Sequence, residues 1–298
     1  MRRLITLLLV PLVALAACSS SSSSKGPPPA SSPPGTAAAP TFPAGSTMDA
    51  IQKRGKLVVG MKFDQPLFGL KDPTSGTVEG FDADIAREMA KGIFGNVKDI
   101  DARVQFVETV SKNRETFISD AKVDIVVATY TINATRKQVV DFAGPYFLAH
   151  EDIMVKKDEG TIKSVTDLNN KKVCSAQGST SIKNLMTAAP QADTSINFDT
   201  YSKCAEALGD GRVQAVVTDN AILAGLVSQS NGTLKLVNAP FSDEPYGIGL
   251  KKDDAAFRMF LNDRLATIEG DGTWKKLFTA TVATGGVATP QPPQPDRY

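Results

Sequence analysis

The length, composition and charge of this chain predict a globular protein that does not bind nucleic acid. It has 298 residues, of which 42% are hydrophobic and 22% are charged, which suits one large or two medium domains with ample core. The formal net charge is +1, and the 33 basic residues less Arg2 and Arg3 of an expected leader leave 31 against 32 acidic ones. A nucleic-acid binder needs a basic surface, which this balance does not supply.

Residues 1–17 predict a secretory leader. Two arginines precede an apolar stretch from residue 4 to 16, which is too short to span a membrane as a helix. The sequence L-A-A-C at residues 15–18 resembles a lipobox. The resemblance implies cleavage before Cys18 and lipidation of its sulfur, which would place the protein on the extracytoplasmic face of the cell membrane. An ordinary signal peptide is the alternative.

The other two cysteines predict a disulfide. If Cys18 is lipidated, Cys174 and Cys204 remain as a pair in an oxidising compartment. The sequence does not show whether their Cα atoms lie within bridging range, so two unrelated buried thiols are the alternative.

Two segments predict disorder. Residues 18–47 are mostly Ser, Pro, Ala and Gly with hardly a charge, and such a segment cannot bury enough surface to fold. We therefore expect a tether, which at ~3.1 Å per residue would hold the folded part roughly tens of Å from the membrane. The proline-rich residues 285–298 predict a disordered tail.

Two connections in the first half are candidate ligand contacts. An apolar strand predicted at 56–61 leads into a loop with Lys62, which the residues alone explain better as an ordinary polar turn. A strand predicted at 103–108 leads through Ser111 and Arg114 into a helix. In α/β proteins, ligands bind where strands end and helices begin.

The segment G-F-D-A-D-I at residues 80–85 predicts the start of a helix with one buried face. Phe81, Ile85, Met89 and Ile93 recur every four residues. We assign the acidic residues of this segment, Asp82 among them, to capping rather than to ligand contact.

The segment from residue 122 to 147 is the strongest candidate for a binding element. Its apolar run at 123–128 predicts a buried strand that ends at Thr129 and Thr131. Asn133 can cap a short helix, which puts Arg136 in the first turn, where a cation is unfavourable unless an anion lies nearby. We therefore interpret Arg136 as an anion ligand, with a solvated first-turn residue as the alternative.

The second half repeats this organisation. Residues 207–219 echo residues 118–129, but the second strand ends at Asp219, an anion where the first half has a cation. Two such half-sites facing each other would suit a zwitterion. A strand at 172–176 leads to Gly178, Ser179 and Thr180, whose free amides at a helix start can bind an anion or simply cap the helix.

Two extended segments bracket the second half and predict a hinge. They imply a discontinuous first lobe of residues 48–151 and 244–284, with a second lobe of residues 152–243 inserted in it. His150 is the single histidine and has no nucleophile elbow nearby, so we interpret it as structural.

The pattern V-D-I-V-V-A-T-x-T-x-x-x-x-R at residues 123–136, followed by V-V-D-F-A-G-P-Y, resembles family 3 of the extracytoplasmic solute-binding proteins. Proteins of this family capture polar amino acids for ABC importers. The resemblance covers residues 48–278 and implies an α/β fold of the two-lobed periplasmic-binding-protein class, type II. Each lobe would be a mixed sheet flanked by helices, with a two-strand hinge between them. We expect a monomer without cofactor or metal.

The resemblance also assigns roles within a ligand cleft. It places the ligand α-carboxylate on Arg136, Thr131 and residues 178–180, and the α-ammonium on Asp219, Thr131 and the carbonyl of Thr129. Lys62, Arg114 and Ser111 match positions that face the second carboxylate in the aspartate- and glutamate-binding branch.

The predicted ligand is therefore L-glutamate or L-aspartate, delivered to the permease subunits of an ABC transporter. Many relatives have an aspartate in the loop that here carries Lys62, and two cations would not be needed for a neutral amide. Tyr201 replaces a histidine of that branch, which leaves glutamate versus aspartate open. A neutral polar amino acid such as glutamine or asparagine, and a sensor that reports to a membrane receptor, are alternatives. An enzyme such as a dehydratase is disfavoured, because no convergent acid/base pair is visible.

Overall fold

The computed structural model describes residues 39–298, so the predicted leader, Cys18 and most of the tether lie outside the described residues. The helices are α1 Thr47–Arg54, α2 Phe81–Phe94, α3 Arg114–Ser119, α4 Thr180–Ala188, α5 Tyr201–Gly209, α6 Asn220–Ser228, α7 Ala255–Gly270 and α8 Thr273–Ala280. The strands are β1 Leu57–Met61, β2 Asp64–Gln65, β3 Gly69–Lys71, β4 Val78–Glu79, β5 Val104–Glu108, β6 Ile125–Val126, β7 Val140–Lys156, β8 Val173–Cys174, β9 Ala215–Asp219, β10 Leu234–Leu236 and β11 Ser242–Lys251.

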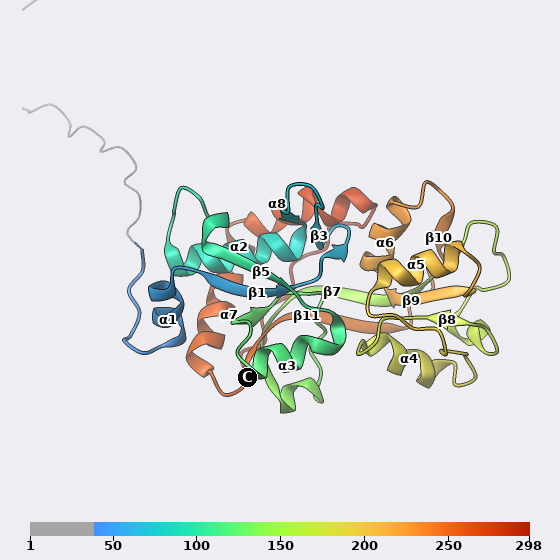
Figure 1. The fold of residues 1–298 in the computed structure, drawn as a ribbon, viewed down its shortest axis with the longest axis horizontal. Coiled ribbons are helices and arrows are strands. Elements are labelled where there is room, and N and C mark those ends of the chain that lie inside the picture. The colour runs from blue at the N-terminus through green and yellow to red at the C-terminus, as the bar shows by residue number, and fades with distance from the viewer. Residues whose placement is uncertain (1–38) are drawn as a thin grey trace, which may run out of the picture. The chain divides into compact units, whose positions relative to one another are not determined.

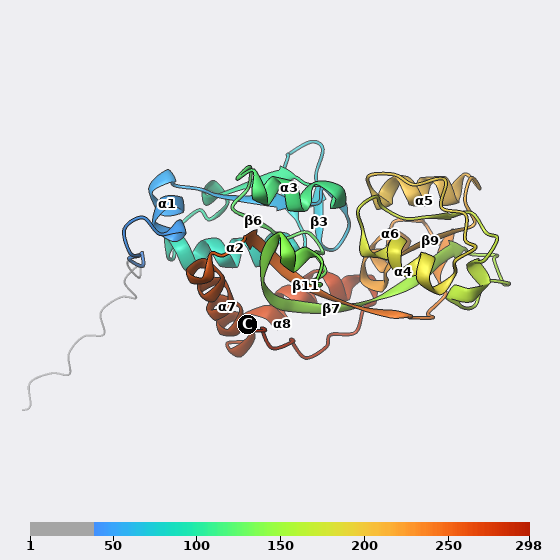
Figure 2. The same ribbon diagram turned by 90° about the horizontal axis from the view of Figure 1, so that it is seen from below.

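The fold is a mixed α/β arrangement of two lobes joined by β7 and β11. These strands pair antiparallel from Ser242 opposite Glu151 to Lys251 opposite Val140. Figure 1 shows them running from the lobe with α2, α3, α7 and α8 into the lobe with α4, α5 and α6, and Figure 2 shows the same two crossings from below. The predicted two-strand hinge is therefore present.

The strand ladder is continuous through the hinge, whereas the sequence predicted a separate sheet in each lobe. The main path is β5-β1-β6-β11-β7-β9-β8, with β10 on β7, and a small sheet β2-β3-β4 lies apart from it. Strand β1 is parallel to β5 and β6, and β8 is parallel to β9. The 17 residues of β7 are enough to pair with β11 in the first lobe and with β9 and β10 in the second.

Each lobe has its own buried core. The predicted stripe of Phe81, Ile85, Met89 and Ile93 has no exposed surface. Phe81 packs edge-on against Trp274, at 5.5 Å between ring centroids, so the C-terminal helix α8 closes the first core. Separate apolar clusters fill the second lobe on the two faces of β9.

Both chain ends of the described part are more ordered than the sequence predicted. Phe42, which we placed in the tether, packs on Phe260 at 5.5 Å between ring centroids. At the other end, the Asp296 amide donates to the Gly144 carbonyl, and the Tyr298 hydroxyl accepts from the Phe142 amide at 3.0 Å. A composition-based prediction of disorder misses such contacts because they depend on single aromatic and polar side chains.

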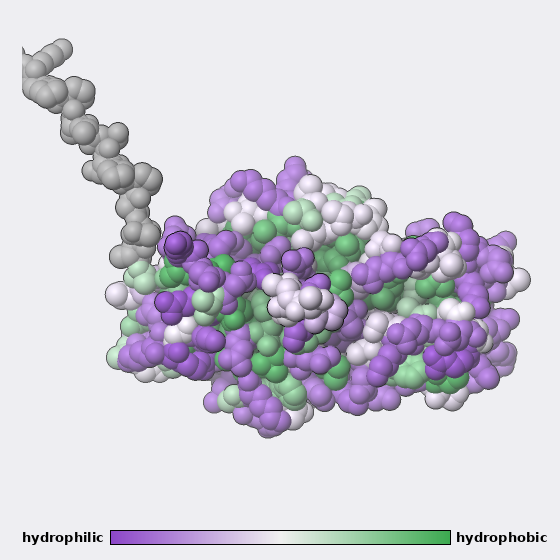
Figure 3. Space-filling model, turned by 45° about the horizontal axis from the view of Figure 1, so that its top comes forward, coloured by the Kyte–Doolittle hydropathy of each residue, from purple (hydrophilic) through white to green (hydrophobic). Residues whose placement is uncertain are grey.

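On the face drawn in Figure 3, hydrophilic residues cover much of the surface, and hydrophobic residues are visible between them. The large exposed apolar side chains of the described residues come from different elements: Leu70, Val139, Leu148, Met186, Met259 and Tyr298. Within residues 39–298, no helix combines the length and the apolar character needed to cross a membrane.

Candidate functional site

Most of the predicted site residues of both lobes line one small cavity of about 10 Å³, whereas Lys62, Arg136 and Gly178 do not line it. The first lobe contributes Ser111, Arg114, Thr129 and Thr131, and the second contributes Ser179, Thr180, Ser181, Tyr201, Asp219 and Ile222. The residues come from the ends of strands or the starts of helices, as the sequence predicted.

Lys62 is a buried cation beside two residues that line this cavity, Ser111 and Tyr201. It follows β1, is 1% exposed, and donates from Nζ to the Ser111 hydroxyl at 2.8 Å. Its ammonium also lies 5.7 Å from the centre of the Tyr201 ring. Burial, helped by the nearby positive charge of Arg114, lowers the pKa of Lys62 to about 7. An anion at this position would restore the charge of Lys62.

Arg114 is a second buried cation beside Lys62. At the start of α3 it is 3% exposed, and its Nη1 donates to the carbonyls of Ala128 and Thr129 at 3.1 and 3.3 Å. Its guanidinium lies 4.3 Å from the centre of the Tyr130 ring. Burial, with a smaller contribution from Arg136, lowers the pKa of Arg114 to about 10.

Arg136 connects the two lobes. Asn133 accepts from its amide at 2.9 Å, as predicted, but the helix that follows is only the short 3-10 turn Arg136–Gln138. Its Nη1 donates to the Thr131 carbonyl at 2.7 Å, and its Nη2 donates to the Gly178 carbonyl of the second lobe at 3.3 Å. Its Nε donates to the Glu115 carboxylate of α3 at 3.1 Å, so Glu115 is its counter-charge among the described residues.

Asp219 closes the opposite side of the cavity. It ends β9, is 4% exposed, and accepts from the Tyr246 hydroxyl through Oδ2. Its Oδ1 has no hydrogen-bond partner among the described residues, which leaves an acceptor free for an ammonium group. Burial, with repulsion from Glu244, raises the pKa of Asp219 to about 7.

Thr129 has a strained backbone that the sequence did not reveal. Its φ is 45°, which a β-branched residue rarely adopts. Asp82 stabilises this conformation, because its Oδ2 accepts from the Thr129 amide at 2.7 Å while its Oδ1 accepts from the Tyr146 hydroxyl at 2.7 Å. The prediction that Asp82 caps its helix is wrong, since the carboxylate orients the site instead.

Sequence reasoning also missed two acids on the hinge strands. Glu244 accepts from Thr131 of the first lobe at 2.6 Å and from Thr180 of the second at 2.8 Å. Glu151 is fully buried, and neither carboxylate oxygen has a partner among the described residues. Burial and the nearby charges of Asp219 and Glu244 raise the pKa of Glu151 to about 8, so it is mostly neutral at pH 7.

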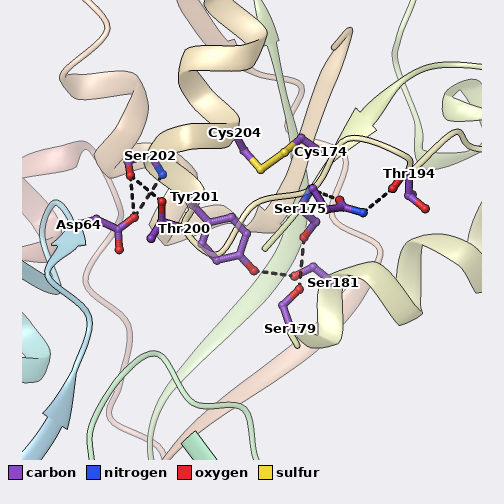
Figure 4. The surroundings of a disulfide bond; sticks show 11 residues. Asp64, Cys174, Ser175, Ser179, Ser181, Thr194, Thr200, Tyr201, Ser202 and Cys204 are labelled. Atoms are coloured by element: carbon purple, nitrogen blue, oxygen red, sulfur yellow. Dashed lines mark hydrogen bonds between the residues drawn. A yellow bond between two sulfur atoms is a disulfide. The ribbon is translucent and has the colours of Figure 1, made fainter. Parts of the chain in front are cut away.

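The predicted disulfide is present and supports the second half-site. Cys174 of β8 and Cys204 of α5 are joined with their Cα atoms 5.5 Å apart. Figure 4 shows Tyr201, one turn before Cys204, pointing toward Ser181 at the start of α4, with 3.3 Å between the hydroxyl oxygens. The bond thus ties together the two segments that line this side of the cavity.

Arg114 and Asp219 line the cavity itself, and the carboxylates of Glu151 and Glu244 lie close to that of Asp219. A cavity of about 10 Å³ holds about one water molecule, so an amino acid would have to enter while the lobes are further apart. No acid/base pair with an orienting partner is visible around the cavity within the described residues.

Comparisons with known proteins identify a family and similar folds. A profile of the bacterial extracellular solute-binding proteins, family 3, matches residues 57–281. The chain is 41% identical over 233 residues to the ABC transporter glutamine-binding protein of Bacillus subtilis, covering 78% of this chain and 83% of that one. It is 37% identical over 241 residues to the glutamate-binding protein of Corynebacterium glutamicum, covering 79% and 81%. Among solved structures, an ancestral arginine-binding protein bound to arginine is similar, with a TM-score of 0.69, 37% identity and coverage of 76% and 98%.

Proposed function

The chain belongs to the bacterial extracellular solute-binding proteins of family 3, and we propose that within this family it captures an acidic amino acid, L-glutamate or L-aspartate. The ligand would bind reversibly between the lobes and be handed to the permease of an ABC importer. We expect no turnover, because the relatives are named for binding.

The observation that carries this proposal is the pair of buried cations Lys62 and Arg114. Every amino acid presents one carboxylate and one ammonium, and Arg136 and Asp219 are already suited to those groups. A neutral side chain would leave Lys62 and Arg114 without a counter-charge in a buried place, which is unfavourable. The second carboxylate of glutamate or aspartate would supply that charge.

Isothermal titration calorimetry of the purified protein tests the proposal. We expect saturable binding of L-glutamate or L-aspartate with a Kd in the micromolar range or below, which corresponds to a binding free energy of about −8 kcal/mol or more negative. Binding of L-arginine or L-glutamine without binding of either acidic amino acid would overturn it.

Glutamine is a second candidate, because a relative that is 41% identical is named for binding it. A protein that binds glutamine must remove the buried positive charge of Lys62 by deprotonating its ammonium group. The lowered pKa of Lys62 makes that feasible. Competition between equal concentrations of the two amino acids at pH 6, where Lys62 is charged, distinguishes the candidates.

We further propose a lipid anchor at Cys18 and a flexible tether that keeps the binding lobes near the importer. Cys18→Ser should release the protein from the membrane fraction while its affinity is unchanged. A sensor that reports the amino acid to a receptor would have the same lobes and ligand. Uptake of radiolabelled glutamate by a deletion strain separates the two, since loss of the protein abolishes uptake only if it serves an importer.

A further inference from the structure

The two lobes contact each other at the start of α5, next to Tyr201, through groups that the predicted ligand contacts do not include. Asp64 of the first lobe points at this helix end in Figure 4. Its Oδ2 accepts from the Ser202 amide at 3.2 Å and from the Ser202 hydroxyl at 2.9 Å. Asp64 and Ser202 are 138 positions apart in the chain and are brought together only by the approach of the lobes.

Helix α5 lacks a side-chain cap from its own segment. Its N-cap residue, Thr200, makes no capping hydrogen bond to the helix, although the helix has nine residues and free amides at its start. A carboxylate that accepts from the second amide of a helix is the usual N-terminal cap, and negative charge there is also favoured by the helix dipole. Asp64 therefore supplies from the opposite lobe the cap that α5 does not supply itself.

Neighbouring contacts show that this helix end is where the lobes meet. Lys112 of the first lobe pairs with Asp199, which immediately precedes the cap residue of α5, at 2.6 Å. The backbone of Lys112 also approaches Gly178 so closely that a Cβ on that glycine would lie 2.5 Å from the Lys112 Cα. Because both partners of the Lys112–Asp199 pair are about 40% exposed, we expect this pair to contribute little on its own.

We propose that Asp64 is an interlobe latch, a positioning residue that caps α5 only when the lobes are closed. It would increase the affinity for whichever amino acid the cleft binds without selecting among them. This inference rests on the proposed function, since it assumes that ligand binds between the lobes. An N-terminal cap typically changes an equilibrium by roughly 2- to 30-fold, which sets the expected size of the effect.

Variants on both sides of the contact test the latch. Asp64 also lies close enough to Lys62 to influence its charge, so Asp64→Ala alone would be ambiguous. Ser202→Ala removes a donor without changing any charge. Asp210→Ala is the matched control, because Asp210 follows the other end of α5 and pairs only with Arg212 among the described residues.

We expect Asp64→Ala to weaken the binding of glutamate and of aspartate by the same factor, within the roughly 2- to 30-fold range of a helix cap. Ser202→Ala removes the hydroxyl donor but keeps the amide donor, so it should weaken both by a smaller factor. The double variant should be no weaker than Asp64→Ala, because both changes remove the same contact. Small-angle scattering at equal ligand saturation should give the same radius of gyration for Asp210→Ala as for the wild type. The latch is overturned if the Ser202 variant keeps wild-type affinity, or if the losses of the two single variants multiply.

Scattering without added ligand separates failure of the latch from failure of the proposed function. If the latch holds, the radius of gyration of Ser202→Ala is at least as large as that of the wild type, and a smaller one overturns it. A failed proposed function is recognised independently, because wild-type protein then binds neither acidic amino acid.

Discussion

The guanidinium groups of Arg114 and Arg136 lie 4.3 and 4.8 Å from the centre of the Tyr130 ring, yet we expect the loss of each to change ligand binding in a different way. Arg136 would hold the carboxylate that all amino acids share, whereas Arg114 would hold the one that only acidic amino acids carry. Arg114→Ala should therefore weaken glutamate by about 2 to 5 kcal/mol and glutamine far less, because a buried anion loses its partner. Arg136→Ala should weaken both alike. Calorimetry with glutamate and glutamine measures these changes. If Arg114→Ala lost the same affinity for both ligands, the assignment would be contradicted.

We expect Lys62 to take up a proton when the amino acid binds. Burial lowers its pKa to about 7, and a ligand carboxylate at the ammonium would raise it again. At pH 6 the lysine is charged in both states, so it takes up no proton. At pH 8 it is mostly neutral before binding, so Lys62 should take up close to one proton when glutamate binds, and its contribution alone should lower the affinity by up to about tenfold per pH unit above 7.

Calorimetry in two buffers of different ionisation enthalpy measures this proton uptake. Lys62→Met is the matched variant, since it keeps the length and loses the charge. Asp219 and Glu151, with pKa values of about 7 and 8, should release protons as an ammonium arrives, so the difference between wild type and variant isolates Lys62. An equal proton count for both proteins at pH 8 would refute the role of Lys62.

The sequence selected three cations and Asp219 as site residues, and all four are buried in the structure, but it did not reveal the contacts of Asp82 and Glu244. Lys62, Arg114 and Arg136 each follow a predicted strand, and that local position is what marks a site in an α/β protein. Asp82 and Glu244 lie inside other elements and reach Thr129 and Thr131 only across 47 and 113 positions of chain. Local patterns carry no information about such contacts.

At the scale of the elements, α6 is built so that the first lobe can approach it closely. A Cβ on Gly225 would lie 2.6 Å from the Pro66 carbonyl oxygen, and its backbone needs no positive φ. Gly225→Ala should therefore favour the helix itself by up to about 1 kcal/mol and disfavour lobe contact by about 1 to 3 kcal/mol.

Thermal unfolding and glutamate titration measure these two effects separately. We expect Gly225→Ala to unfold at or above the wild-type midpoint without ligand while binding glutamate more weakly. Gly209→Ala is the control, because that glycine ends α5 and a Cβ added to it would meet nothing within 4 Å. Unchanged affinity in Gly225→Ala would mean that Pro66 moves aside at little cost.

At the scale of the whole molecule, two extended segments bracketing the second half predicted a hinge, and the family resemblance implied the two-lobed fold. The long crossings β7 and β11 were visible as extended segments bracketing the second half, although their pairing into one ladder was not. That ladder depends on cross-strand register, as between Glu151 and Ser242, which period alone does not fix across a lobe boundary. The contacts of the C-terminal residues were also missed, because their partners in the first lobe are far away in the sequence.

The hinge allows the two lobes to move relative to each other. Ligand that touches Arg136 of one lobe and Asp219 of the other binds the closed arrangement better, and that difference in affinity shifts the hinge equilibrium toward closure. The structure holds the lobes in contact, with Arg136 on Gly178 and Lys112 on Asp199, and so describes the closed end of this motion. We expect that in solution the protein without ligand is mostly open and that glutamate lowers its radius of gyration. Asp219→Ala should keep weak binding through the first lobe while losing most of the compaction, because the second half-site no longer contacts the ammonium. Small-angle scattering with and without ligand measures both, and an unchanged wild-type profile at saturation would show that the cleft does not close on its ligand.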